Sequence, residues 1–222
     1  MAIQIIAEVR KFIGHSLGGG EKTVRMTAVE SLATAQVEPA RFELTRSGRR
    51  YIGGNSIIAN GIAPVAAIPT TTATLALFNG EPTGGRSYAI ERINFWLGSG
   101  TAAAGATLMV NPSTARLATA PTAMATGYAA QSASGSARAS RALWATAQTF
   151  PAAPANSWIG VVSTLQLAAA NAGQGDGVVD LEGAIVIPPG YALGFAILSG
   201  AGTTPLYGIS ATWAEIEAEL ES

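Results

Sequence analysis

The chain has 222 residues, of which 12% are charged, and a formal net charge of −1 at pH 7. Charged residues make up roughly 25% of an ordinary globular domain, so this chain carries about half the usual content. A protein that stays monomeric needs a charged surface to remain dispersed. We therefore expect neighbouring subunits to cover much of the surface of this protein.

Composition also excludes several classes of protein. The chain has no cysteine, which excludes disulfides and thiol chemistry and is compatible with assembly in a reducing cytoplasm. Its near-neutral charge argues against a nucleic-acid partner. No window approaches 18 uninterrupted, strongly apolar residues, and the first residues lack the basic and apolar regions of a signal peptide. We therefore expect no membrane partner.

Short runs typical of β-strands dominate the chain, separated by Gly, Pro and Asn turns. Ile93, Phe95 and Leu97 alternate with polar residues, the period of two that marks a half-buried strand, and Tyr207–Ile216 shows the same alternation. The predicted strands, in chain order, are Ile3–Val9, Lys22–Val29, Arg41–Thr45, Tyr51–Ile58, Thr71–Phe78, Tyr88–Leu97, Ala106–Val110, Trp158–Leu167, Val178–Ile187, Ala192–Leu198 and Tyr207–Ile216.

Long amphipathic helical patterns are absent, so the sequence predicts an all-β fold, an antiparallel β-sandwich. Residues 47–222 are the predicted sandwich domain. Residues 1–46 carry more charge and are predicted to form an N-terminal arm or a small β subdomain. Residues 113–155 are rich in Ala, Ser and Thr, and we expect a long low-complexity excursion there. A short helix is predicted within it, around Arg138–Ala147.

Charge is unevenly distributed along the chain. Between Glu91 and Asp176 there is no acid, and no Lys or Arg follows Arg141. The charges of the acid-free stretch and of the last residues are Arg92, Arg116, Arg138, Arg141, Glu215, Glu217, Glu219 and Glu221. Two interpretations stay open: the basic middle pairs with the acidic end of a neighbouring subunit, or the acidic end is simply solvated.

The run Gly14-His15-Ser16-Leu17-Gly18 fits the G-x-S-x-G nucleophile elbow found in lipases. A serine nucleophile needs a separate base, and His15 is the only histidine and adjoins Ser16. The elbow also follows a central strand of a parallel α/β sheet, and no βαβ alternation follows here. We interpret the run as a Gly-rich hinge that would let the first strand leave its own subunit.

No catalytic, cofactor-binding or metal-binding residue is predicted. A glycosidase needs two carboxylates that meet in a cleft, and Glu43, Glu91, Asp180 and Glu182 are the acids that could do so. The favoured alternative is that these acids form ordinary ion pairs or lie on solvated faces. A single histidine cannot supply a zinc site. Residues 173–177 are similar to one copy of a calcium-binding Gly–Asp repeat, for which a hairpin loop is the favoured alternative. Phosphate-loop and dinucleotide fingerprints are missing.

The four tryptophans have two possible roles. Trp96, Trp158 and Trp213 lie on or beside predicted strands, where core packing is the default. Trp144 lies in the low-complexity excursion, where an aromatic side chain is either core or the anchor of an interface.

Four stretches carry a resemblance to virion proteins of tailed phages. Arg49–Val65 leads into the Thr-rich run Thr70–Gly80, which ends in an aromatic residue and Asn-Gly and continues into the Gly-rich turn and strand of Gly84–Ile93. Gly183–Leu193 resembles the strand, Pro-Pro-Gly, strand corner of jelly-roll domains associated with capsids. The resemblance implies a decoration or cement protein, a homotrimer whose jelly roll binds neighbouring subunits of a major capsid protein. It implies no catalytic residues.

We therefore predict a non-enzymatic structural protein of the virion, of jelly-roll type, assembled in the host cytoplasm. Its expected partners are copies of itself and a major capsid protein. One alternative is a major capsid protein, disfavoured because the first 46 residues lack the basic excess of arms that package nucleic acid. The other is a receptor-binding module of a tail fibre, disfavoured by loops made of Ala, Gly, Ser and Thr.

Overall fold

The computed structural model describes residues 25–26, 32–33, 40–55, 61–101, 105–122, 128–135, 139–151, 158–164, 176–199 and 203–217. Contacts divide the chain into two units, Met1–Ala40 and Arg41–Ser222. In the first, β1 (Arg25–Met26) pairs antiparallel with β2 (Leu32–Ala33). The predicted strand Ile3–Val9 and the run Gly14–Gly18 lie outside the described residues.

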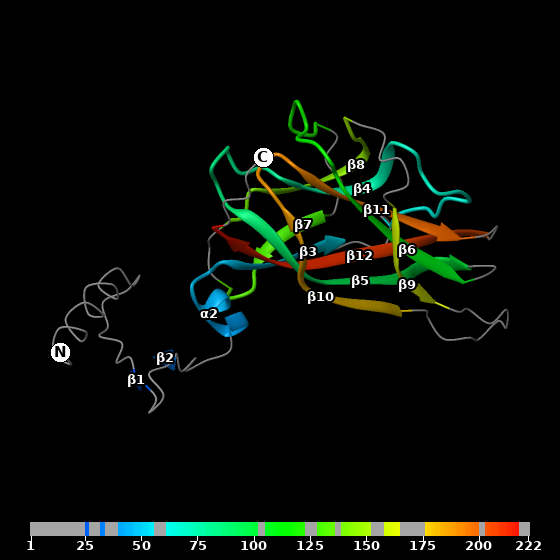
Figure 1. The fold of residues 1–222 in the computed structure, drawn as a ribbon. Coiled ribbons are helices and arrows are strands. Elements are labelled where there is room, and N and C mark those ends of the chain that lie inside the picture. The colour runs from blue at the N-terminus through cyan, green and yellow to red at the C-terminus, as the bar shows by residue number, and fades with distance from the viewer. Residues whose placement is uncertain are drawn as a thin grey trace, which may run out of the picture. The chain divides into compact units, whose positions relative to one another are not determined.

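The second unit is a sandwich of two antiparallel five-stranded sheets (Figure 1), which confirms the predicted all-β fold class. Sheet one has the order β10-β5-β12-β3-β7 and sheet two the order β8-β4-β11-β6-β9. The jelly-roll arrangement stays a prediction. The strands are β3 (Arg50–Asn55), β4 (Thr72–Asn79), β5 (Ser87–Thr101), β6 (Ala106–Pro112), β7 (Tyr128–Ser132), β8 (Ala142–Thr149), β9 (Ile159–Thr164), β10 (Asp176–Ile187), β11 (Ala192–Ser199) and β12 (Thr203–Ile216).

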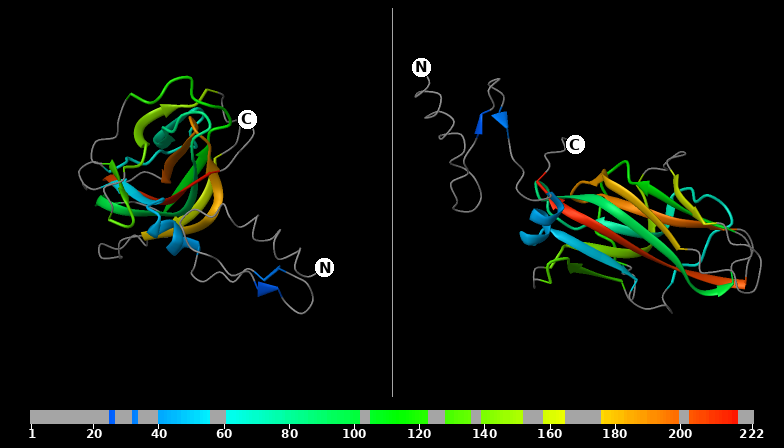
Figure 2. Two further views of the ribbon diagram at one scale, coloured as in Figure 1. Left: turned by 90° about the vertical axis from the view of Figure 1, so that its left-hand side faces the viewer. Right: turned by 90° about the horizontal axis from the view of Figure 1, so that it is seen from below.

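Nearly every connection along the chain crosses from one sheet to the other. From β3 to β12, consecutive strands alternate between the sheets, except that β8 and β9 share sheet two and lie at its opposite edges. The strands that pair are therefore distant in sequence, and the two sheets face each other as layers (Figure 2). Because β9 and β10 belong to different sheets, the hairpin loop predicted between them is wrong.

The predicted strand Arg41–Thr45 is also wrong, because a short helix, α2 (Ala40–Arg46), occupies these residues. The Thr45 hydroxyl donates to the Arg41 carbonyl at 2.8 Å, and Arg46 pairs with Glu43 one turn earlier at 2.7 Å. The helix ends at Arg46, and two residues later Gly48 has a φ of 67°. A glycine can adopt this left-handed conformation without steric cost, which makes it a common helix terminator.

Two strands lie inside the excursion predicted for residues 113–155. They are β7 and β8, and the short helix predicted around Arg138–Ala147 is wrong because Ala142–Thr149 is β8. β8 pairs with β4 in a register that sets Trp144 opposite Leu77. Helix propensity of alanine is a weak preference, and the ladder with β4 overrides it. None of the described helices is long and apolar enough to cross a membrane.

The main core lies between the sheets and follows the period of two. On β5 and β12 the alternating residues predicted to be buried are buried, among them Ile93 and Ile209. Trp213 stacks on Tyr51 with ring centroids 6.0 Å apart, and Trp144 stacks on Phe195 at 5.8 Å. Trp144 is only 2% exposed, so it is a core residue and not the exposed interface anchor considered from sequence.

A second, smaller apolar cluster covers the outward face of sheet two. β11 is buried on both faces: large side chains such as Phe195 point into the main core, and the small residues Ala192, Gly194 and Ala196 face outward. Phe150, from the segment after β8, lies on this small-residue strip and is 4% exposed. A Cβ added at Gly194 would lie 2.7 Å from the Phe150 ring, so the glycine is needed for this close approach.

We expect Phe150→Ala to lower the free energy of unfolding by about 3 kcal/mol, because it removes a buried ring from a strip that cannot collapse around the cavity. Urea denaturation measures the change. The matched control is Phe42→Ala on α2, where the ring is 51% exposed and the expected loss is below about 1 kcal/mol. Equal losses for the two variants would contradict the role given to Phe150.

Candidate functional site

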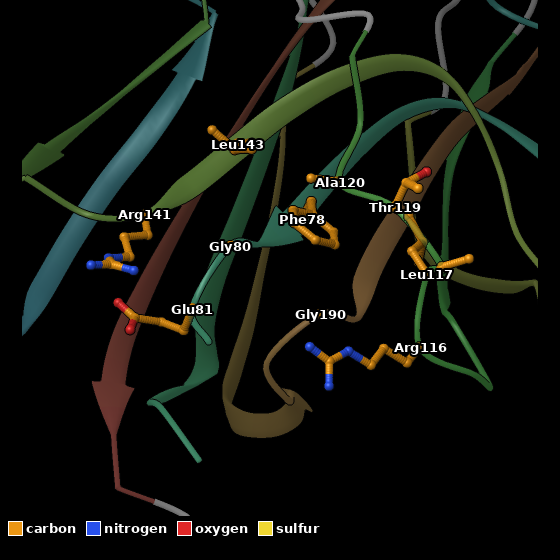
Figure 3. A pocket seen from close by; sticks show the side chains of 11 residues that line it. Phe78, Gly80, Glu81, Arg116, Leu117, Thr119, Ala120, Arg141, Leu143 and Gly190 are labelled. Atoms are coloured by element: carbon orange, nitrogen blue, oxygen red, sulfur yellow. The ribbon is translucent and has the colours of Figure 1, made fainter. Parts of the chain in front are cut away.

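A cleft of about 650 Å³ opens at the surface of the sandwich. Phe78 at the end of β4, Leu117 after β6 and Leu143 on β8 give it an apolar floor. Its charged side chains are Arg116, Arg141 and Glu81, so the cleft carries a net positive charge. In Figure 3, Phe78 lies between the two arginines, and Glu81 lies on the Arg141 side.

A buried asparagine holds the turns that form the wall of this cleft. The Asn79 side chain is fully buried and donates to the carbonyls of Arg86 at 2.8 Å and Ile187 at 2.9 Å. Its oxygen accepts from the Glu81 amide at 3.0 Å, and its backbone carbonyl accepts from the Gly190 amide at 2.8 Å. One residue therefore joins the β4–β5 and β10–β11 connections at the same end of the sandwich.

Arg116 lies against the turn at Gly190. Its guanidinium donates to the Thr83 hydroxyl, and the neighbouring Leu117 amide donates to the Gly190 carbonyl at 2.9 Å. Gly190 has a φ of 82°, and a Cβ there would collide with the Arg116 side chain. The glycine of the Pro-Pro-Gly turn is thus needed both for the backbone conformation and to make room for Arg116.

The two arginines of the cleft differ from the other arginines whose side chains are described. Those in ion pairs with a carboxylate of the same chain are Arg41, Arg46, Arg49, Arg50, Arg86 and Arg92. Within the described part of the chain, neither Arg116 nor Arg141 has a carboxylate within ion-pair distance. The two arginines described without a carboxylate partner therefore line the same cleft.

A second, neighbouring pocket of about 490 Å³ shares Glu81 and Arg141 with the cleft and is also lined by Arg86, Glu215 and Glu217. Glu215 is 2% exposed, accepts from the Ser140 hydroxyl at 2.8 Å and faces Arg86 at 3.4 Å. Burial raises the pKa of Glu215 above its ordinary value, and it outweighs the opposing effects of Ser140 and Arg86.

The C-terminal acids that the sequence offered for pairing between subunits are partly used within the chain. Glu215 pairs with Arg86, and Glu217 pairs with Arg49 at 3.1 Å. Glu219 and Glu221 lie outside the described residues. The arginines that pair with Glu215 and Glu217, Arg86 and Arg49, therefore come from outside the acid-free middle of the chain.

The acids considered as a carboxylate pair are not brought together as one. Each binds its own arginine; the pairs are Glu43 with Arg46, Glu91 with Arg50, Asp180 with Arg92, and Glu182 with Arg41. The hydrogen bond from Arg92 lowers the pKa of the Asp180 carboxyl. No three His, Cys, Asp or Glu side chains among the described residues are grouped closely enough to hold a metal ion. His15 and Ser16 lie outside those residues.

The outward side of sheet one, which we call the β5 face, carries exposed residues such as Ile52, Arg92 and Val178. A bulge at Glu91 sets Arg92 opposite Thr212 but Ile90 opposite Trp213, so Glu91 turns outward and pairs with Arg50 at 2.7 Å. The face is crossed by rows of aligned residues. One row is Asp180, Arg92, Thr212, Ile52 and Gln131, and the next is Val178, Asn94, Ser210, Gly54 and Ala129.

Sequence reasoning missed the cleft, although its parts carried signals. Asn79-Gly80 and Pro188-Pro189-Gly190 were read as turns, and both arginines lie in the acid-free stretch. What the sequence could not provide was the meeting of these segments. That meeting depends on strand pairings between residues far apart in the chain.

We expect the stability of the wild type relative to Glu215→Gln to fall as the pH rises. The pKa of Glu215 is raised in the folded protein, so the folded state binds the proton more tightly than the unfolded state. The stability that proton binding by Glu215 adds to the folded state is complete below its ordinary pKa of 4.5. It is lost as the pH rises through the raised pKa of the folded state. Thermal denaturation of both proteins between pH 4 and pH 8 measures it. A difference that grows in favour of the wild type with pH would show that the Arg86 pair dominates instead.

Comparison of the chain with protein-family models, curated proteins and solved structures finds no match. The function therefore has to be argued from the composition, the β5 face and the cleft.

Proposed function

We propose that this chain is a non-enzymatic structural protein of a virus particle. It acts as a decoration protein that assembles with copies of itself, as a trimer, and binds neighbouring subunits of a major capsid protein. Its place is the virion, after assembly in the host cytoplasm. The low charge content and the intrachain pairing of most described arginines support a surface meant for protein contact.

The observation that carries the proposal is the β5 face. Ile52 is 50% exposed and Val178 is 56% exposed on this face. Arg92 and Asp180 are the exposed charged residues in these rows of the β5 face. They neutralise each other in an ion pair, with Nε and Oδ1 2.7 Å apart. A surface with exposed aliphatic groups and little free charge loses little on desolvation, and it gains from apolar burial against another subunit.

A receptor-binding module is the second candidate, and Trp96 favours it. The half-buried indole lies directly over Gly208 on the β5 face, where a Cβ at Gly208 would collide with it. Asn94 donates to the Ser210 hydroxyl nearby, at 3.2 Å. An aromatic ring flat on a sheet beside amide and hydroxyl groups can stack on a sugar ring and hydrogen-bond its hydroxyls.

We expect the wild type to have the mass of a trimer by light scattering at micromolar concentration. The double variant Ile52→Asp/Val178→Asp should shift it to a monomer, because burying the new carboxylates in an interface is costly. Thr146→Asp is the control, since Thr146 is exposed on β8 of the other sheet and should leave the mass unchanged. A monomeric wild type would contradict the proposal.

A glycan array distinguishes the second candidate from the first. A decoration protein should give no binding above background. Reproducible hits that Trp96→Ala abolishes, with circular dichroism unchanged, would replace the decoration role by receptor binding.

A further inference from the structure

The cleft lined by Arg116 and Arg141 has the chemistry of a peptide site. Two exposed guanidinium groups flank an apolar floor of Phe78, Leu117 and Leu143. Arginine binds carboxylates with up to two parallel hydrogen bonds, which suits it to acidic partners. The ligand that fits is a segment carrying carboxylates close to an aliphatic side chain.

The cleft itself supplies few carboxylates that could neutralise the two arginines. Glu81 is its one acidic lining residue, and it also borders the second pocket, where its negative charge helps to raise the pKa of Glu215. Arg116 is held by a neutral hydroxyl, and its position is fixed by the turn at Gly190. A guanidinium held in place in this way loses less conformational freedom when it binds an anion.

Two segments of the chain place a leucine between two acids, and the acids of one, Asp180 and Glu182, already pair with Arg92 and Arg41. The other is the segment after Glu217. Residues 218–222 read Ala-Glu-Leu-Glu-Ser, with a leucine between two acids and no basic residue. The preceding acids, Glu215 and Glu217, are already paired with Arg86 and Arg49. The acids of residues 218–222 and the leucine between them thus match the two arginines and the apolar floor of the cleft in charge and in character.

We propose that residues 218–222 of a second copy bind in this cleft, with Glu219 and Glu221 pairing to Arg116 and Arg141 and Leu220 contacting the apolar floor. This inference rests on the proposed function, because it adds a second contact between the copies beside that of the β5 face. The two surfaces differ, so the contact is heterologous, and repeating it around an axis closes a ring. A ring of three copies is the trimer that we expect.

Two charge-reversed full-length variants test the contact by light scattering. In the first, Arg116→Glu/Arg141→Glu reverses the cleft; in the second, Glu219→Arg/Glu221→Arg reverses the segment. Each alone should be monomeric where the wild type is a trimer. Mixing the two should give species larger than a monomer, starting with a dimer of one copy of each, because each variant then meets its complement; a ring of three cannot close, since two of its three members would be the same variant. The chain that carries both reversals should regain the trimer mass. Arg41→Glu/Arg46→Glu on α2 changes the net charge by the same amount as the cleft variant and should keep the wild-type mass.

Peptide binding gives a second measurement that does not depend on assembly. A fluorescein-labelled peptide of residues 218–222 should bind the Glu219→Arg/Glu221→Arg protein, whose own segment cannot compete. Adding Arg116→Glu/Arg141→Glu should weaken this binding at least tenfold, with circular dichroism confirming the fold.

The outcomes separate the inference from the proposed function. If the cleft variant keeps the wild-type trimer mass, the inference is overturned and the assembly role stands. If the wild type is itself monomeric, the assembly role fails first. If the chain carrying both reversals is a trimer but the mixture of single reversals stays monomeric, the segment binds its own cleft, which also overturns the contact between copies.

Discussion

The fold depends on one constraint, the crossing of nearly every connection between the two sheets. A strand such as β4 has β8 and β11 as neighbours, and neither adjoins it in sequence. Neither sheet can therefore be completed by local hairpins, and both must form together around the core between them. Such non-local pairing demands early loop closure and predicts slow folding. It also explains why the buried aromatic pairs, such as Tyr51 with Trp213, join segments from opposite ends of the chain.

The same constraint creates the cleft. Because β4–β5 and β10–β11 both cross at one end of the sandwich, their turns meet there, and the buried Asn79 amide fixes them to each other. β8 is the strand within the predicted excursion that belongs to sheet two. It pairs with β4 and so brings Arg141 to the turns that line the cleft. The cleft thus follows from the strand topology. The hydrogen bonds of Asn79 link the turns that form its wall.

Charge is distributed in keeping with an assembling protein. The exposed pairs, such as Arg92 with Asp180, contribute little stability in water, but they leave the β5 face without free charge. The more buried pairs, Arg50 with Glu91 and Arg86 with Glu215, satisfy groups that would otherwise be costly to bury. Among the arginines whose side chains the structure describes, the two without a carboxylate partner, Arg116 and Arg141, both line the cleft.

The sequence by itself determined where most strands lie, since the alternation of buried and exposed residues in β5 and β12 is a local property of an extended chain. It also determined the turns at Asn79 and Gly190, which need particular side chains or a positive φ. Tertiary structure alone decided which strands pair, because pairing joins residues far apart. It decided that Arg41–Thr45 is helical, where Phe42 stays exposed, and that Trp144 is buried, because the ladder with β4 turns its ring inward. The meeting of Arg116 and Arg141 in one cleft follows from those same pairings.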